Sequence, residues 1–150
     1  MADLIEFLRA RLDEDERIAR DAARESRNDQ WSSSPYGDSV YADDTGRPIL
    51  CGPYDYLADE LKTYITRWHP KRMRDEVEAK REILDLHMPQ RPVYDEDAAR
   101  LICRTCGVAD GWHDTPAPCD TLKLLAQPYA VHPDYDPEWM VSSDERRISG

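Results

Sequence analysis

Three of the four cysteines of this chain lie in one short segment, CRTCGVADGWHDTPAPC, residues 103–119. Two residues separate Cys103 from Cys106, Gly107 follows, and twelve further residues lead to Cys119. Two cysteines at this spacing can wrap a tight turn around a metal, and the glycine lets backbone amides approach the thiolates. Cys119 directly precedes a predicted helix, whose N-terminus favours the ionised thiol. The spacing predicts a tetrahedral zinc site of the zinc-knuckle type with three thiolate ligands.

A redox pair and a disulfide are the alternatives for these thiols. A redox Cys-x-x-Cys motif opens a helix after a strand, and Gly107 together with Asp110 and Gly111 argues against a helix here. The chain starts with MADLIEFLRARLDEDER, which lacks the apolar core of a signal peptide, so we expect a cytoplasmic protein with reduced thiols. Cys51 stands apart from the segment, and we expect it to be a small buried hydrophobe.

The residues alone leave the fourth ligand open. His87 ends a long predicted helix, His113 lies inside the cysteine loop, and His132 follows the last predicted helix. His69, next to Pro70, is expected to cap a helix.

The first half of the chain predicts helices around one small β-hairpin. In segment 1–28, leucines recur every four residues after Asp3, which predicts a capped amphipathic helix. Segment 36–51 has two short strands flanking the turn sequence DDTG. Segment 55–87 predicts two helices that meet at Pro70. The apolar face expected for the first comprises Leu57, Leu61, Tyr64, Ile65 and Trp68, and that of the second Met73, Val77, Ile83 and Leu84.

The second half predicts the cysteine segment and a short helix. Residues 100–140 should hold the zinc knuckle, a helix capped by Asp120 or Thr121, and the anchors Tyr135 and Trp139. Residues 141–150 are expected to be a flexible tail. These segments predict a single domain over residues 1–150 of the α+β class, mainly helical, with three to four helices, one small β-hairpin and a zinc-knuckle segment.

Net charge and the lack of long apolar runs disfavour two classes of partner, nucleic acid and membranes. The chain has 150 residues and a formal net charge of −11, so nucleic acid is disfavoured as a partner because phosphates would be repelled. No stretch approaches the 18 apolar residues of a membrane span, so we expect none. An acidic surface suits docking on another protein.

Four stretches resemble an uncharacterised family of small zinc-knuckle proteins from actinomycetes and actinophages. They are FLRARLDEDE, EVEAKREILDLH, CRTCG with the later Cys119, and LLAQPYAVHPDYDPEW, and the region around 30–55 is not covered. The resemblance implies that the helix-ending His87 joins Cys103, Cys106 and Cys119 around one Zn²⁺, in preference to His113. It also implies a phage-associated or accessory role, and it carries no established activity.

A shell of three thiolates and one imidazole is closed, whereas catalytic zinc keeps a position open for water. We therefore favour a non-enzymatic interaction or accessory module with a protein partner. One alternative is a metal-dependent hydrolase that uses Asp110, His113 and Asp114, although no HExxH or GxSxG motif accompanies them. Another is a zinc-scaffolded transcriptional regulator, which would need a basic recognition helix that the sequence does not predict.

Overall fold

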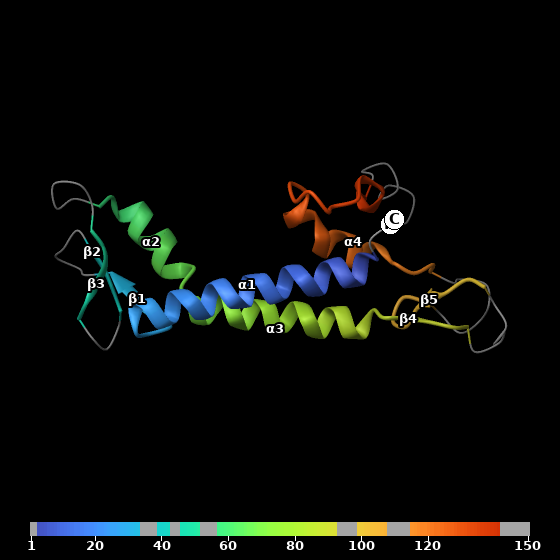
Figure 1. Ribbon diagram of the computed structural model, residues 1–150, viewed down its shortest axis with the longest axis horizontal. Coiled ribbons are helices and arrows are strands. Elements are labelled where there is room, and N and C mark those ends of the chain that lie inside the picture. Colours follow the sequence, from blue (N-terminus) through green and yellow to red (C-terminus); the bar gives the residue numbers. More distant parts are fainter. Residues whose placement is uncertain are drawn as a thin grey trace. The chain divides into compact units, whose positions relative to one another are not determined.

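The computed structural model describes residues 3–33, 39–42, 46–51, 57–92, 99–107 and 115–141. Figure 1 shows the elements that these residues form, which are α1 (Leu4–Ser26), β1 (Trp31–Ser33), β2 (Ser39–Ala42), β3 (Pro48–Cys51), α2 (Asp59–Arg67), α3 (Pro70–Leu86), β4 (Pro89–Gln90), β5 (Ile102–Cys103) and α4 (Asp120–Ala126). Four helices and short antiparallel strands confirm the predicted mainly helical α+β class. No helix among the described residues is long and apolar enough to cross a membrane.

The chain forms two compact units. Unit 1 comprises Met1–Leu12 and Lys80–Gly150, and unit 2 comprises Asp13–Ala79. Helices α1 and α3 each contribute one end to each unit. The expected flexible tail falls almost wholly on residues 142–150, which lie outside the described residues.

Helix α1 begins as the sequence predicts. The Asp3 carboxylate accepts a hydrogen bond from the Ile5 amide at 2.9 Å, which caps the first turn. The large apolar residues of its first half are buried, namely Leu4, Ile5, Phe7, Leu8 and Leu12, whereas Ile18 further along is exposed. The helix ends at Ser26, and the next residue, Arg27, has a φ of 62°, which a helix cannot continue.

The core of unit 1 joins the start of α1 to the C-terminal part of the chain. Leu84 of α3, Leu122 and Ala126 of α4, and Trp139 pack with the apolar residues of α1 in one cluster. The Phe7 ring lies at the centre of an aromatic group that includes the expected anchors Tyr135 and Trp139, with centroid distances of 6.0 Å and 5.0 Å.

Unit 2 holds a three-stranded antiparallel sheet in the order β1-β2-β3. The predicted hairpin is its β2–β3 pair, with Val40 opposite Leu50, while turn residues 43–45 lie outside the described part. The sequence analysis missed β1, because WSS has no alternation of apolar and polar residues. The Trp31 indole nitrogen donates to the Ser26 hydroxyl at 3.2 Å, which links β1 to the end of α1.

The two helices predicted in segment 55–87 are separated just before Pro70, as predicted. Pro70 is the first residue of α3, and the residue before a proline is disfavoured in a helix. His69 caps α3 as predicted, because its Nδ1 accepts the Arg72 amide at 3.2 Å. The predicted helix start at Asp55 lies outside the described residues, and the described helix α2 begins at Asp59.

The prediction for the apolar face of α2 is wrong in large part. Leu57 is buried, but Leu61, Tyr64 and Trp68 are 53%, 64% and 37% exposed. Lys62 is buried in their place and forms an ion pair with Asp59 at 2.7 Å. The polar side of α2 therefore packs on β1 and β2, and its aromatic side does not.

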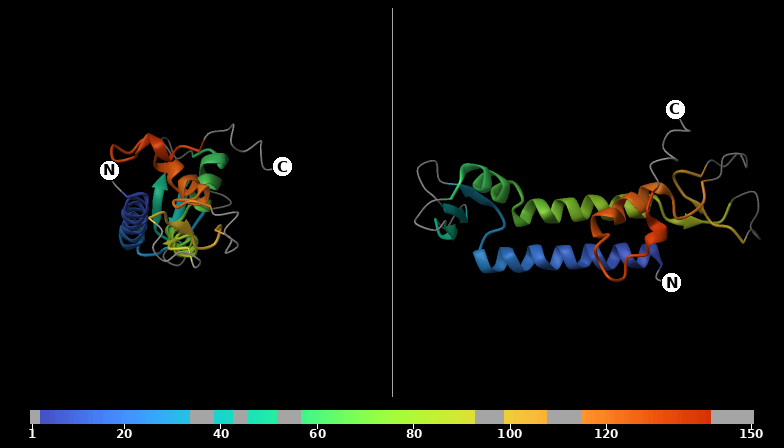
Figure 2. Two further views of the ribbon diagram at one scale, coloured as in Figure 1. Left: turned by 90° about the vertical axis from the view of Figure 1, so that its right-hand side faces the viewer. Right: turned by 90° about the horizontal axis from the view of Figure 1, so that it is seen from above.

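The short elements of unit 1 follow α3 closely. Strands β4 and β5 pair antiparallel, with Pro89 opposite Cys103, directly beyond the end of α3 (Figure 2). The chain then returns to pair Ile102 with Pro116 before α4 begins. This arrangement brings the end of α3, the β4–β5 pair and the start of α4 to one place.

Candidate metal centre

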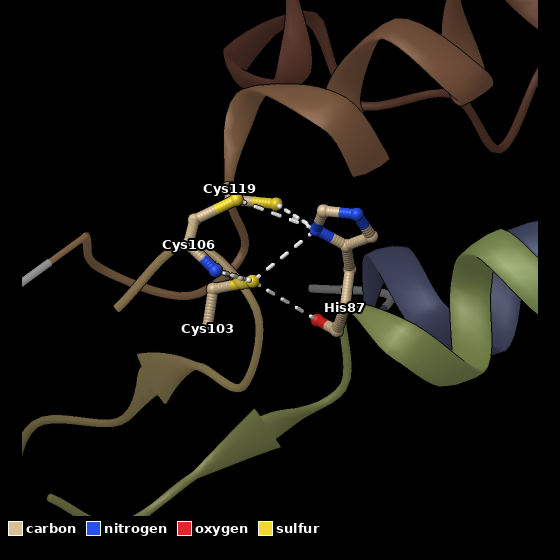
Figure 3. A group of neighbouring side chains, drawn as sticks. All are labelled: His87, Cys103, Cys106 and Cys119. Atoms are coloured by element: carbon tan, nitrogen blue, oxygen red, sulfur yellow. Dashed lines mark hydrogen bonds between the residues drawn. The ribbon is translucent and has the colours of Figure 1, made fainter. Parts of the chain in front are cut away.

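His87 is placed by the end of α3. Its backbone amide donates to the carbonyls of Ile83 and Leu84 at 3.2 Å and 3.1 Å, so it closes the last turn of the helix. Its Nδ1 atom points at the three cysteine side chains that the cysteine segment provides (Figure 3).

Cys103 and Cys106 are held by a tight turn at the end of β5. The Cys106 amide donates to the Cys103 sulfur at 3.4 Å, and the Gly107 amide donates to the Cys103 carbonyl at 2.8 Å. An amide directed at a sulfur stabilises its thiolate form, which is the form that binds metal. Both bonds require the backbone to fold closely around Cys103.

Gly107 makes that close fold sterically feasible. A Cβ atom at this position would lie 2.7 Å from the Cys103 carbonyl oxygen and 3.0 Å from Cδ1 of Ile102. A backbone oxygen cannot move aside as the end of a flexible side chain can. The sequence analysis assigned Gly107 to this turn, and the structure gives the physical reason.

Cys119 enters from the start of α4. It is the N-cap residue of that helix, with φ −76° and ψ 168°, and its carbonyl accepts the Leu122 amide at 3.1 Å. The predicted caps were Asp120 or Thr121, but Asp120 is already the first helical residue. With Cys119 at the cap position, no side-chain capping bond forms, and the sulfur is directed toward His87.

The four donor atoms converge with nearly equal spacing. The Nδ1 atom of His87 lies 3.4 Å from the sulfurs of Cys103, Cys106 and Cys119 alike. All four donor atoms lie within 4.8 Å of one another. Tetrahedral zinc with Zn–S of about 2.3 Å and Zn–N of about 2.0 Å would set each N···S separation at about 3.5 Å. The cluster could therefore hold one metal ion at its centre.

Burial shields two of the four cluster residues from water. Cys103 is 0% exposed and Cys119 is 2% exposed, and both belong to the apolar core of unit 1. Cys106 and His87 are half-buried. All three cysteines are free thiols, so no disulfide competes for the sulfurs.

The thiols of the cluster cannot all ionise easily unless a cation lies among them. Burial, together with the neighbouring Cys103 and Cys119 sulfurs, raises the pKa of the Cys106 thiol to about 12. Burial also opposes ionisation of Cys103, but hydrogen bonds from the amides of Cys106 and Thr105 outweigh it and lower the pKa of Cys103. Without a cation, one thiolate therefore forms at the expense of its neighbour. A divalent metal would stabilise all three at once.

Two threonines support the cluster, and neither was predicted from the sequence. The Thr105 hydroxyl donates to the Leu86 carbonyl, beside His87. The Thr115 hydroxyl donates to the Cys106 carbonyl at 3.0 Å, and its own carbonyl accepts the Cys103 amide at 3.0 Å. The position of Thr105 between the two cysteines was a usable signal, whereas nothing in the local pattern marked Thr115.

The other sequence candidates lie elsewhere. The His132 ring packs edge-on against Phe7 at a centroid distance of 5.7 Å and contacts Arg11. His113, Asp110 and Asp114, the residues named for a hydrolase, lie outside the described residues. The side chain of Cys51 also lies outside the described part. Among the described residues, His87 is the histidine that meets the three sulfurs.

Comparison with known proteins gives a family. The model of DUF6221, described as a family of unknown function, matches residues 1–141. The chain belongs to this family. Residues 1–141 include all of unit 2, unit 1 as far as residue 141, and all four residues of the cluster. No curated protein and no solved structure matches the chain.

Proposed function

We propose that the protein is a small, acidic, zinc-stabilised interaction module that acts by binding another protein rather than by catalysis. The observation that supports it best is the cluster of His87, Cys103, Cys106 and Cys119, whose donor atoms lie within 4.8 Å of one another. Four protein donors complete the tetrahedral shell of zinc and leave no position for a reacting water. Three thiolates and an imidazole also suit Zn²⁺ better than hard cations such as Mg²⁺.

The stabilising role follows from where the donors come from. His87 ends α3, Cys103 and Cys106 flank the knuckle turn, and Cys119 begins α4. A metal among them would cross-link the segments that form the core of unit 1. Three free thiols suit a reducing compartment, so we place the protein in the cytoplasm.

The net charge of the protein supports the proposal that it binds another protein. A net charge of −11 favours a basic protein surface over nucleic acid as the partner. The resemblance to small actinomycete and actinophage proteins extends the proposal to a phage-associated accessory role.

Cobalt substitution tests whether the shell is closed. We expect metal analysis of the purified protein to find one zinc per chain, and the cobalt form to show the visible spectrum of a tetrahedral thiolate site. Adding azide or imidazole should leave that spectrum unchanged, because no coordination position is open. A cobalt-substituted zinc enzyme that keeps a water at its fourth metal position serves as the control, since its spectrum should respond to the same ligands. A wild-type spectrum that shifts with azide would favour a catalytic metal, and iron in the purified protein would reject zinc.

A further inference from the structure

The face of α2 that the sequence predicts to be buried is exposed in unit 2. Leu61, Tyr64 and Trp68 follow one another at intervals of three and four residues, so they lie along one side of the helix. Their exposed fractions are 53%, 64% and 37%. We call these three residues the α2 stripe.

The α2 stripe borders an open groove of about 590 Å³ in unit 2. The rings of Tyr64 and Trp68 line it, with centroids 6.4 Å apart and planes inclined by 48°. The Arg72 guanidinium lies 4.4 Å from the centroid of the Trp68 ring and holds the indole in place. These contacts restrain the indole, and a restrained side chain lowers the entropic cost of association.

The charges along this groove have opposite signs at its two ends. Glu60 lies at the start of α2 and Arg67 at its end, and both line the groove. Both side chains are exposed, and neither forms an ion pair with another described residue. Glu60 and Arg67 are seven residues apart, which is about two helical turns, so they lie on the same side with Tyr64 between them.

We propose that the α2 stripe binds a second copy of this chain, with the two α2 helices antiparallel about a two-fold axis near Tyr64. In that arrangement, Glu60 of each copy lies opposite Arg67 of the other, Leu61 and Tyr64 meet between the two ion pairs, and Trp68 flanks them on the outside. A two-fold interface requires a self-complementary surface, and a stripe with opposite charges at equal distances from its centre meets that requirement. A parallel arrangement would instead place like charges together.

The area that the α2 stripe can bury determines how strongly two copies should associate. One helix of nine residues buries less than the ~1,200 Å² typical of stable interfaces, so we expect a dimer that dissociates on dilution. The proposal involves unit 2 alone and does not depend on the metal cluster, whose residues all belong to unit 1.

Sedimentation velocity of the full-length protein over a concentration series tests the dimer. We expect the mass to rise with concentration from 17.4 kDa toward twice that value. Tyr64→Ser should remain monomeric over the same series, because it removes the centre of the stripe. The control Val131→Ser changes an apolar residue of unit 1 that is 97% exposed, and it should leave the association unchanged. A wild-type protein that stays monomeric at every concentration, or a Tyr64→Ser variant that associates as wild type does, would overturn the proposal.

Mixing charge-reversal variants tests the antiparallel geometry. Glu60→Arg and Arg67→Glu should each weaken self-association by about tenfold or more, because each places like charges opposite one another. An equimolar mixture of the two should associate again, since every pair is then of opposite sign. Restored association also shows that both variants are folded. The control Glu82→Arg, an exposed residue of α3 in unit 1, should have no effect. If the mixture associates no better than either variant alone, the antiparallel arrangement is wrong.

Discussion

The Nδ1 atom of His87 lies 3.4 Å from the sulfur of Cys119, although 32 positions separate the two residues in the sequence. No hydrogen-bonded ladder joins these two positions directly. The contact depends on α3 ending at Leu86, on the β4–β5 pair reversing the chain, and on α4 beginning directly after Cys119. Four predictions follow from this arrangement and from the core around it.

Removing one ligand should cost both metal and stability. We expect Cys119→Ser and His87→Ala each to lose most of the bound zinc and to unfold at a lower temperature, as wild type does after chelation. A loss of about 3 kcal/mol would lower the melting temperature by roughly 6–12 °C in a chain of this size. Metal content and thermal unfolding, each with and without chelator, measure these effects.

Matched controls exist for both changes. Cys51→Ser and His69→Ala should keep one zinc per chain, because neither residue belongs to the cluster. His69→Ala should still lower stability slightly, since it removes the cap of α3. A Cys119→Ser variant that keeps full zinc content and wild-type stability would contradict the ligand assignment.

Zinc affinity should fall as the pH is lowered. In the metal-free protein the pKa of Cys106 is about 12, so this thiol carries its proton at neutral pH and must release it to bind zinc. Each released proton makes the affinity rise about tenfold per pH unit, and fall by the same factor on acidification. Competition with a chelator of known proton affinity, between about pH 6 and about pH 8, gives the slope. Cys106→Ser should bind more weakly with a shallower slope, and a flat wild-type profile would show that no proton is displaced.

Adding a methyl group to Gly107 should open the knuckle turn. The new Cβ would lie 2.7 Å from the Cys103 carbonyl oxygen, so we expect Gly107→Ala to cost ~1–3 kcal/mol of stability and to weaken zinc binding. Chelator competition and denaturant unfolding measure the two effects.

Gly46→Ala is an informative control for that change. No atom lies within 4 Å of a Cβ at Gly46, but its φ of 60° makes a side chain unfavourable by roughly 1–2 kcal/mol. It should therefore lower stability without changing zinc affinity. Equal zinc affinities for Gly107→Ala and wild type would show that the close approach at Gly107 does not shape the metal centre.

The aromatic core of unit 1 should depend on Phe7. Its ring contacts those of Tyr129, Tyr135 and Trp139, and it is 5% exposed. We expect Phe7→Ala to lower the free energy of unfolding by ~3–5 kcal/mol in urea titrations with zinc present. Val131→Ala, at a residue that is 97% exposed, should change it by less than ~0.5 kcal/mol. A Phe7→Ala cost as small as that of Val131→Ala would mean that this core does not hold unit 1 together.

Features that depend on neighbours within a few residues were determined by the sequence. The leucine spacing of α1, the cap at Asp3 and the division at Pro70 all follow from local backbone geometry. The same holds for the turn at Cys103, Cys106 and Gly107, since the Cys106 amide reaches a sulfur only three residues away and Gly107 leaves room for the close fold. These patterns therefore predicted the helices and the close pair of Cys103 and Cys106, and the spacing to Cys119 pointed to the third cysteine of the candidate metal cluster.

Tertiary structure decided which distant groups meet. His87, His113 and His132 were equivalent on local pattern, and the resemblance alone favoured His87; the length of α3 and the register of β4 and β5 bring its Nδ1 to the sulfurs. Likewise, the periodicity of α2 showed an apolar side but not the direction in which it points. The sheet of unit 2 packs on the side that carries Lys62, so the aromatic side remains exposed. A periodic pattern identifies the faces of a helix, but only the surfaces available around it determine which face is buried.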